Sequence, residues 1–444
     1  MLNPPLSLLS DDLLLYIVDH VAKLPFSDDD LYNLSITDRA FTRFCQIYIF
    51  KDLYLGYGSG TNTSLSKKLA KIRNILNDEP SIANGVRSVH ITAIRKRNRW
   101  LFNDPNFITV FQLLAKSLMP PHKLHLSGLS YSFIFEDPIC AVERLMKSFF
   151  SQTLTVLYLT HCKNVPLTLI LVCPNLKEVY LDNVEVFDSR VDEYPDTQCS
   201  GGEPPSLELL NYCNSESLVK QMITPPLKFS MAVIDWSKLR VLKLCPQEKE
   251  GMVCLQPILD AACNTLEELY LTNLRVTWGI DGKIVILMEM TQIWQISQQE
   301  QLSLTGLVDL RHLPSLHIFA IHALIRCDAL EPVVLRDINL VLSTIQKANQ
   351  VSKLSLDFTI YVEDPSDRFL EDDWVGMCHE VARISAGKAL TLNLGISFID
   401  SPVKCQYPPP GRDELHECIK EKMASLSDYP NICTHWSSSF TDMT

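Results

Sequence analysis

Two groups of residues have types and spacings that could support chemistry. Gly56-Tyr-Gly58-Ser-Gly60 is rich in glycine, but it lacks the Gly-Lys-Ser/Thr of a phosphate-binding loop and the third glycine of a dinucleotide-binding turn. His312, His317 and His322 are spaced by five residues, which places no two of them neatly on one face of a strand or helix. A flexible loop and separate histidines are therefore the expected structures.

The cysteine pattern predicts thiols that pack in the protein core and are not reactive. The chain has 14 cysteines without a Cys-x-x-Cys pair, and several lie in apolar strand or helix patterns, which favours reduced, buried thiols in a reducing compartment. Cys378 precedes His379-Glu380, yet an amphipathic helical pattern already accounts for it. We therefore predict a non-catalytic protein with no metal or cofactor site.

Composition limits the partners. The 444 residues are 46% hydrophobic and 21% charged, as in a large folded protein, and carry a net charge of −12, which argues against nucleic acid or an anionic membrane as a partner. The basic cluster Arg95–Arg99 is expected to be a solvated loop. No apolar run is long enough to span a bilayer, and Asp11-Asp12 follows too early for a signal peptide. These features predict a cytoplasmic or nuclear location.

The elements that position these residues follow one repeated pattern, L-x-x-L-x-L. Its last two apolar positions have period two and predict a buried strand face, while the residue between them points outward. The copies begin at Phe50, Val86, Pro121, Leu154, Leu176, Leu207, Leu239, Leu266, Leu316, Val351 and Ala389. Helix-like segments precede most copies: Asn106–Leu118, Cys140–Phe150, Val165–Cys173, Met252–Cys263, Leu335–Ala348 and Asp373–Ile384. A strand–helix unit cannot bury its own apolar face, so an α/β solenoid with a parallel sheet is expected, with an ordinary parallel α/β domain as the alternative.

The outward position of each copy forms a candidate binding row. It contains Tyr54, His90, His125, Tyr158, Tyr180, Asn211, Lys243, Tyr270, Ala320, Ser355 and Asn393. Tyr158 and Tyr180 should be neighbours on adjacent strands. Because tyrosine is common in binding hot spots, Tyr54, Tyr158, Tyr180, Lys243 and Tyr270 are predicted to contact a protein substrate. The alternative is that the rings stack only to shield the sheet.

Residues 1–50 predict three short helices. Ser10 can cap a first helix that begins with Asp11-Asp12, Asp28–Asp30 can start a second, and Asp38 can start a third. So small a group of helices needs something on which to dock.

The segments Leu9-Ser-Asp-Asp-Leu13-Leu14-x-x-Ile17 and Leu34-Ser-Ile-Thr-Asp-Arg-Ala-Phe41 resemble the F-box, and the repeats resemble the irregular leucine-rich repeats of fungal F-box proteins. The resemblance implies a substrate-recognition subunit of a Skp–cullin–F-box ubiquitin ligase, with the repeats holding an unknown target protein. It also implies contacts from Leu9, Leu13, Leu14, Ile17, Leu34 and Phe41 to a Skp-type adaptor, which joins the cullin. Ser10 replaces the usual proline, and Phe41 stands where tryptophan is frequent. The alternative is a repeat scaffold whose N-terminal helices only cap the first repeat.

The predicted limits are an F-box-like helical domain at 1–50, a leucine-rich-repeat-like solenoid at 51–436 and a C-terminal tail at 437–444. The repeat family also places Asn or Cys just beyond the strand core, where the side chain bonds to backbone. Only Cys162 is in register for that position, and Asn183 comes one residue early.

Overall fold

The chain is an α/β protein that divides into two compact units, Met1–Pro205 and Ser206–Thr444. The computed structural model describes residues 9–24, 27–56, 62–93, 101–128, 132–187, 203–224, 233–245, 249–272, 277–278, 284–285, 308–326, 334–362, 373–400 and 412–441. The basic cluster Arg95–Arg99 and most of the glycine-rich loop after Gly56 lie outside these residues.

Three helices open unit 1: α1 (Asp11–Ala22), α2 (Ser27–Thr37) and α3 (Arg39–Ile49). The predicted caps are present, because Ser10 Oγ accepts from the Leu13 amide at 3.4 Å and Asp38 Oδ1 accepts from the Ala40 amide at 2.9 Å. The helices share a core of their own, formed by Leu14, Val18, Leu31, Phe41, Phe44 and Cys45.

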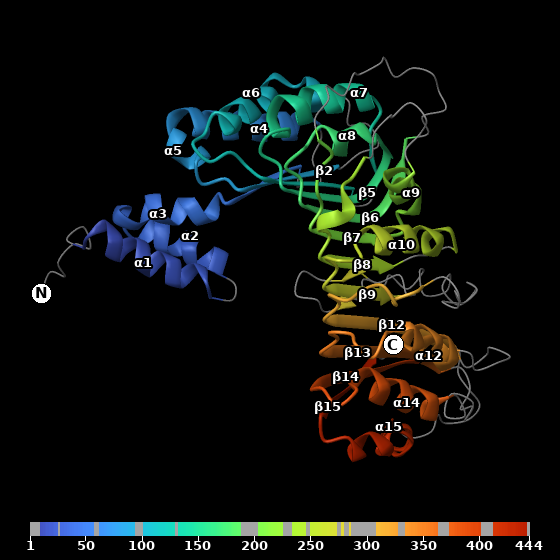
Figure 1. Ribbon diagram of the computed structural model, residues 1–444. Helices are drawn as coiled ribbons and strands as arrows, with labels where there is room; N and C mark the ends of the chain where they lie inside the picture. The colour runs from blue at the N-terminus through green and yellow to red at the C-terminus, as the bar shows by residue number, and fades with distance from the viewer. Residues whose placement is uncertain are drawn as a thin grey trace, which may run out of the picture. The chain divides into compact units, whose positions relative to one another are not determined.

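The remainder of unit 1 is a parallel sheet with helices along one face (Figure 1). Its strands follow the chain in the order β1 (Asp52–Leu55), β2 (Ser88–Ala93), β3 (Lys123–Gly128), β5 (Val156–Val165) and β6 (Glu178–Val186), and β4 (Phe133–Ile134) pairs with β5. The helices are α4 (Asn62–Asp78), α5 (Pro80–Ala83), α6 (Pro105–Ala115), α7 (Pro138–Ala141), the π-helical η3 (Val142–Phe150) and α8 (Thr168–Leu171), with a short 3-10 turn at Leu101–Asn103.

Unit 2 repeats the arrangement. Its parallel strands are β7 (Leu209–Cys213), β8 (Val241–Cys245), β9 (Glu268–Thr272), β12 (Ile318–Arg326), β13 (Lys353–Val362), β14 (Leu390–Asp400) and β15 (Ile432–Thr441). Its helices are α9 (Glu216–Ile223), α10 (Lys249–Ala261), α12 (Val334–Thr344), α14 (Trp374–Ser385) and α15 (Arg412–Lys422), with 3-10 turns at Trp236–Lys238 and Ala424–Asp428. In Figure 1, α10, α12 and α14 lie along one face of these strands. A separate antiparallel pair is formed by β10 (Thr277–Trp278) and β11 (Ile284–Val285).

The predicted strand register is confirmed. Every copy of the L-x-x-L-x-L pattern contributes a strand, and the last two apolar positions of each copy are buried, as with Leu157 and Leu159 in β5 or Leu269 and Leu271 in β9. Equivalent positions pair across neighbouring strands, so Leu126 lies beside Leu159 and Leu159 beside Leu181. Alternation of buried and outward side chains fixes this register, because a slip of one residue would expose every leucine.

The side chain just beyond the strand core bonds to backbone at Cys162, as the repeat pattern predicts. Its buried thiol donates to the Leu126 carbonyl of β3, at an Sγ–O distance of 3.4 Å. Asn183 has a φ of 52°, which places its backbone in the left-handed region that asparagine tolerates well. His161 on β5 has a φ of 51°, and its Nδ1 lies 2.7 Å from Asn183 Nδ2.

The C-terminal end differs from the prediction. Residues 437–441 of the predicted tail belong to β15, which pairs with β14 from Leu390↔Ile432 to Ile399↔Thr441. The L-x-x-L-x-L pattern does not extend to this strand, because Thr434, opposite Leu392, occupies a position that is apolar in every copy.

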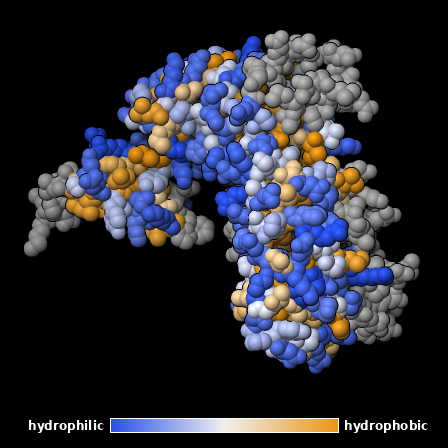
Figure 2. Space-filling model, viewed as in Figure 1, coloured by the Kyte–Doolittle hydropathy of each residue, from blue (hydrophilic) through white to orange (hydrophobic). Residues whose placement is uncertain are grey.

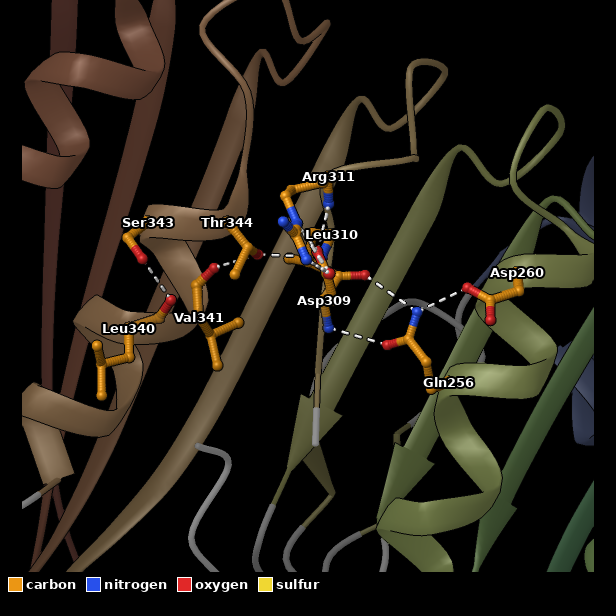
Figure 3. A network of polar contacts seen from close by, with 9 residues as sticks. All are labelled: Gln256, Asp260, Asp309, Leu310, Arg311, Leu340, Val341, Ser343 and Thr344. Atoms are coloured by element: carbon orange, nitrogen blue, oxygen red, sulfur yellow. Dashed lines mark hydrogen bonds and ion pairs between the residues drawn. The ribbon is translucent and has the colours of Figure 1, made fainter. Parts of the chain in front are cut away.

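Polar contacts join successive helices of unit 2 (Figure 3). The Gln256 side chain on α10 accepts from the Asp309 amide at 2.9 Å, and its Nε2 donates to Asp260 Oδ1 at 2.7 Å. The next amide, Leu310 N, donates to Thr344 Oγ1 on α12 at 3.0 Å. These bonds satisfy the backbone of the segment before β12 and tie α10 to α12.

Gly56→Ala is expected to destabilise the protein by about 2 kcal/mol, against about 1 kcal/mol for Gly387→Ala. Both glycines have positive φ, +121° and +83°, but a Cβ at Gly56 would lie 2.2 Å from the Thr92 carbonyl oxygen, whereas one at Gly387 would meet nothing within 4 Å. Urea denaturation of both variants measures the difference. Equal losses would contradict the close approach of β1 and β2 at this point.

Candidate functional site

An aromatic row runs across the outer face of the unit 1 sheet, opposite the helices. Strand pairing places Tyr54 beside His90, His90 beside His125, His125 beside Tyr158, and Tyr158 beside Tyr180. We call these five side chains the unit 1 row. The structure therefore brings together three predicted site residues, Tyr54, Tyr158 and Tyr180, with two histidines between them.

The rings of the unit 1 row are in continuous contact. The Tyr54 and His90 rings are stacked with centroids 4.4 Å apart, and the Tyr158 and Tyr180 rings are stacked at 4.2 Å with an interplanar angle of 11°. His125 bridges the two stacks, 5.2 Å from His90 and 5.4 Å from Tyr158. Tyr54 at one end is 52% exposed, and the others are half-buried, so the row both shields the sheet and presents ring surface.

The histidines do not form a catalytic relay. His90 Nε2 lies 2.8 Å from Ser88 Oγ and 3.9 Å from Asp52 Oδ1, so both groups approach the same nitrogen. A serine–histidine–carboxylate triad needs them on opposite nitrogens. The other nitrogen of His90, Nδ1, instead lies 3.2 Å from Nδ1 of His125. The pKa of His125 is lowered to about 4, chiefly by burial and to a smaller extent by the nearby His90.

Acidic groups flank the tyrosine stack. The Tyr180 hydroxyl donates to Glu178 Oε2 at 3.1 Å. The pKa of Tyr180 is raised, chiefly by burial and to a smaller extent by Tyr158 and Glu178. Asp182, two residues further along β6, is largely enclosed, and burial raises the pKa of its carboxyl. Glu178 thus places a carboxylate beside Tyr180, whereas burial favours the neutral form of Asp182.

The corresponding row of unit 2 is more enclosed. It places Asn211, Lys243, Tyr270, Ala320, Ser355 and Asn393 in register and adds His435 of β15, which the sequence pattern missed. Lys243 is only 7% exposed, and its ammonium lies over the Tyr270 ring, 4.9 Å from the centroid. Lys243 is thus committed to an internal cation–π contact, which limits its use toward a partner.

A buried histidine lies next to this row. His322 is 4% exposed, and both ring nitrogens meet hydroxyls, Nδ1 with Thr272 Oγ1 at 3.3 Å and Nε2 with Thr359 Oγ1 at 2.8 Å. Burial lowers its pKa to about 3, so it is neutral in the fold. Histidine spacing in the sequence carried no signal for this arrangement.

The predicted adaptor residues differ in how far they are buried. Leu14 and Phe41 are buried in the core of α1–α3, where they hold the helices together. Leu9, Ile17 and Leu34 are half-buried against that core, and Leu13 is 44% exposed. Tyr16 and Leu24, which the sequence reading did not select, are 68% and 46% exposed. The signal available in the sequence for Tyr16 was its spacing, because it lies three positions after Leu13 and so on the same side of a helix.

The described residues include no cluster of metal-binding side chains. Among them no three His, Cys, Asp or Glu side chains converge to hold a metal ion, and the Cys378 thiol is buried, which raises its pKa. Within the same residues no helix is both long and apolar enough to cross a membrane.

Comparison with known proteins leaves the family open. A scan against models of protein families gives no match, and a search of curated proteins finds no significant relative.

Proposed function

We propose that this protein is the substrate-recognition subunit of a Skp–cullin–F-box ubiquitin ligase in the cytoplasm or nucleus. Helices α1–α3 are the F-box-like domain that binds the Skp-type adaptor, and through it the cullin. The strands and helices from residue 51 onward form a leucine-rich-repeat-like solenoid whose outer sheet face, with the unit 1 row, binds the target protein. The protein itself carries out no chemistry and brings the target to the ligase.

The observation that carries this proposal is the apolar surface left on α1. The three helices already bury Leu14, Val18 and Phe41 in their own core, yet Leu13 and Tyr16 remain 44% and 68% exposed. Residues three apart lie on one side of a helix, so these two share a face. In Figure 2, orange side chains interrupt the blue surface of this helical group, at the left of the view. Such a face favours a protein partner.

Leu13→Asp is expected to abolish binding to a purified Skp-type adaptor, with a loss of at least about 100-fold in affinity, because the carboxylate must be desolvated at the interface without a partner. Leu15→Asp is the matched control. Leu15 is 40% exposed on the same helix but lies roughly 200° around the axis from Leu13, so its variant should bind normally. Binding is measured by calorimetry, and cullin retrieval by pull-down.

Both variants should melt at the temperature of the unmutated chain, since neither leucine is in the helix core. If the unmutated chain fails to bind under conditions where an established F-box protein binds, the ligase assignment is wrong. The alternative, a repeat scaffold with a helical cap, then takes its place. Equal losses from Leu13→Asp and Leu15→Asp would also count against an adaptor surface on this side of α1.

A further inference from the structure

The same three-residue arrangement occurs on one strand of each unit. Glu178-Val-Tyr180 in β6 and Glu268-Leu-Tyr270 in β9 occupy equivalent positions of the repeated pattern. In both, the tyrosine hydroxyl donates to Oε2 of the glutamate, at 3.1 Å in β6 and 2.8 Å in β9. The two strands therefore present the same pairing of a ring and a carboxylate.

In unit 2 the chain itself supplies a cation to this arrangement. Lys243 of β8 is the cross-strand neighbour of Tyr270, and its ammonium lies 4.9 Å from the centre of that ring. A ring face attracts a cation electrostatically, and the Glu268 carboxylate adds negative charge beside it. This internal example indicates what a glutamate–tyrosine pair on this face can hold.

In unit 1 the equivalent position holds no cation. The neighbour of Tyr180 on β5 is Tyr158, which stacks on it, and on the outer face the nearest lysine in register is Lys123, on β3. Within the part of unit 1 that the structure describes, no lysine or arginine pairs with Glu178. Glu178 and Tyr180 are both partly exposed, so a carboxylate and ring surface remain accessible.

We propose that Glu178 and Tyr180 form a receptor for one lysine or arginine side chain of the target protein, the intermolecular counterpart of the Lys243 contact in unit 2. This assignment rests on the proposed function, since it names what the target-binding face recognises. It predicts that segments bound by unit 1 carry a cationic residue, stacked on or beside the Tyr158–Tyr180 pair.

The test uses the full chain labelled with 3-fluorotyrosine and followed by ¹⁹F NMR, with Nα-acetylarginine methylamide as the probe. The Tyr180 resonance, identified by its loss in Tyr180→Phe, is expected to shift in a saturable way. The matched neutral probe, Nα-acetylcitrulline methylamide, should leave it unchanged. The Tyr270 resonance should not respond, because the Lys243 ammonium already lies over the Tyr270 ring.

Three variants sharpen the result. Glu178→Gln should weaken the arginine response by about fivefold, whereas Glu421→Gln, which removes one exposed carboxylate elsewhere, should not change it. Lys243→Met should make the Tyr270 resonance respond to arginine as Tyr180 does.

A Tyr180 resonance that ignores arginine, or responds equally to citrulline, overturns the receptor. Adaptor binding is measured separately in the same preparations. If the chain binds the adaptor but shows no arginine response, only the proposed arginine receptor is wrong. If it shows the arginine response but does not bind the adaptor, only the proposed ligase role is wrong.

Discussion

Leu159→Ala is expected to lower the free energy of unfolding by about 2–5 kcal/mol, because it leaves a cavity at a fully buried position between Leu126 and Leu181. Tyr158→Ala, one residue away, should cost about 1 kcal/mol. Its ring is half-buried on the opposite face, and the variant loses chiefly the stacking with Tyr180. Urea denaturation followed by circular dichroism gives both values.

Unit 2 offers a matched pair. Leu271→Ala truncates a 3%-exposed leucine at the same position of β9, and Tyr270→Phe removes only the hydroxyl that donates to Glu268. We expect the leucine variant to be destabilised by about 2–5 kcal/mol and the tyrosine variant by about 1 kcal/mol. A larger loss at the tyrosines than at the leucines would contradict the register in which leucines face the helices.

Lowering the pH from 7 to 4 is expected to cost about 3 kcal/mol of stability through His322 alone. The pKa of His322 is lowered by burial to about 3 in the fold, against an ordinary value of 6.5. The unfolded chain therefore takes up a proton below pH 6.5 while the folded chain stays neutral, so stability is lost as pH falls, at up to about 1.4 kcal/mol per unit, and the loss ends near pH 3.

A variant comparison isolates this contribution. Asp357, the cross-strand neighbour of His322, has a pKa raised by burial and so acts in the opposite direction as pH falls. His322→Gln keeps a polar group between Thr272 and Thr359 but cannot titrate, so its stability should fall less steeply between pH 6.5 and 4. His317→Gln, at an exposed histidine, should follow the unmutated chain. If the three pH profiles are parallel, His322 is not held neutral in the fold.

The repeated spacing in the sequence determined the strands and their register. Leucines of period two can be buried only on one face, which forces Tyr158 and Tyr180 onto the other and makes them neighbours. The caps at Ser10 and Asp38 were also readable, because side-chain oxygens at these positions satisfy local amides whatever the tertiary structure.

The burial and the contacts of each side chain were decided only by the tertiary structure. Spacing placed Lys243 and Tyr54 in the same kind of outward position, but one is enclosed against Tyr270 and the other is 52% exposed. The burial that keeps His322 neutral is likewise set by residues 37 to 50 positions away in the chain. Pairing with β14 made a strand of residues 432–441, to which the L-x-x-L-x-L pattern does not extend. Burial and pKa depend on neighbours brought together by folding, which local spacing does not specify.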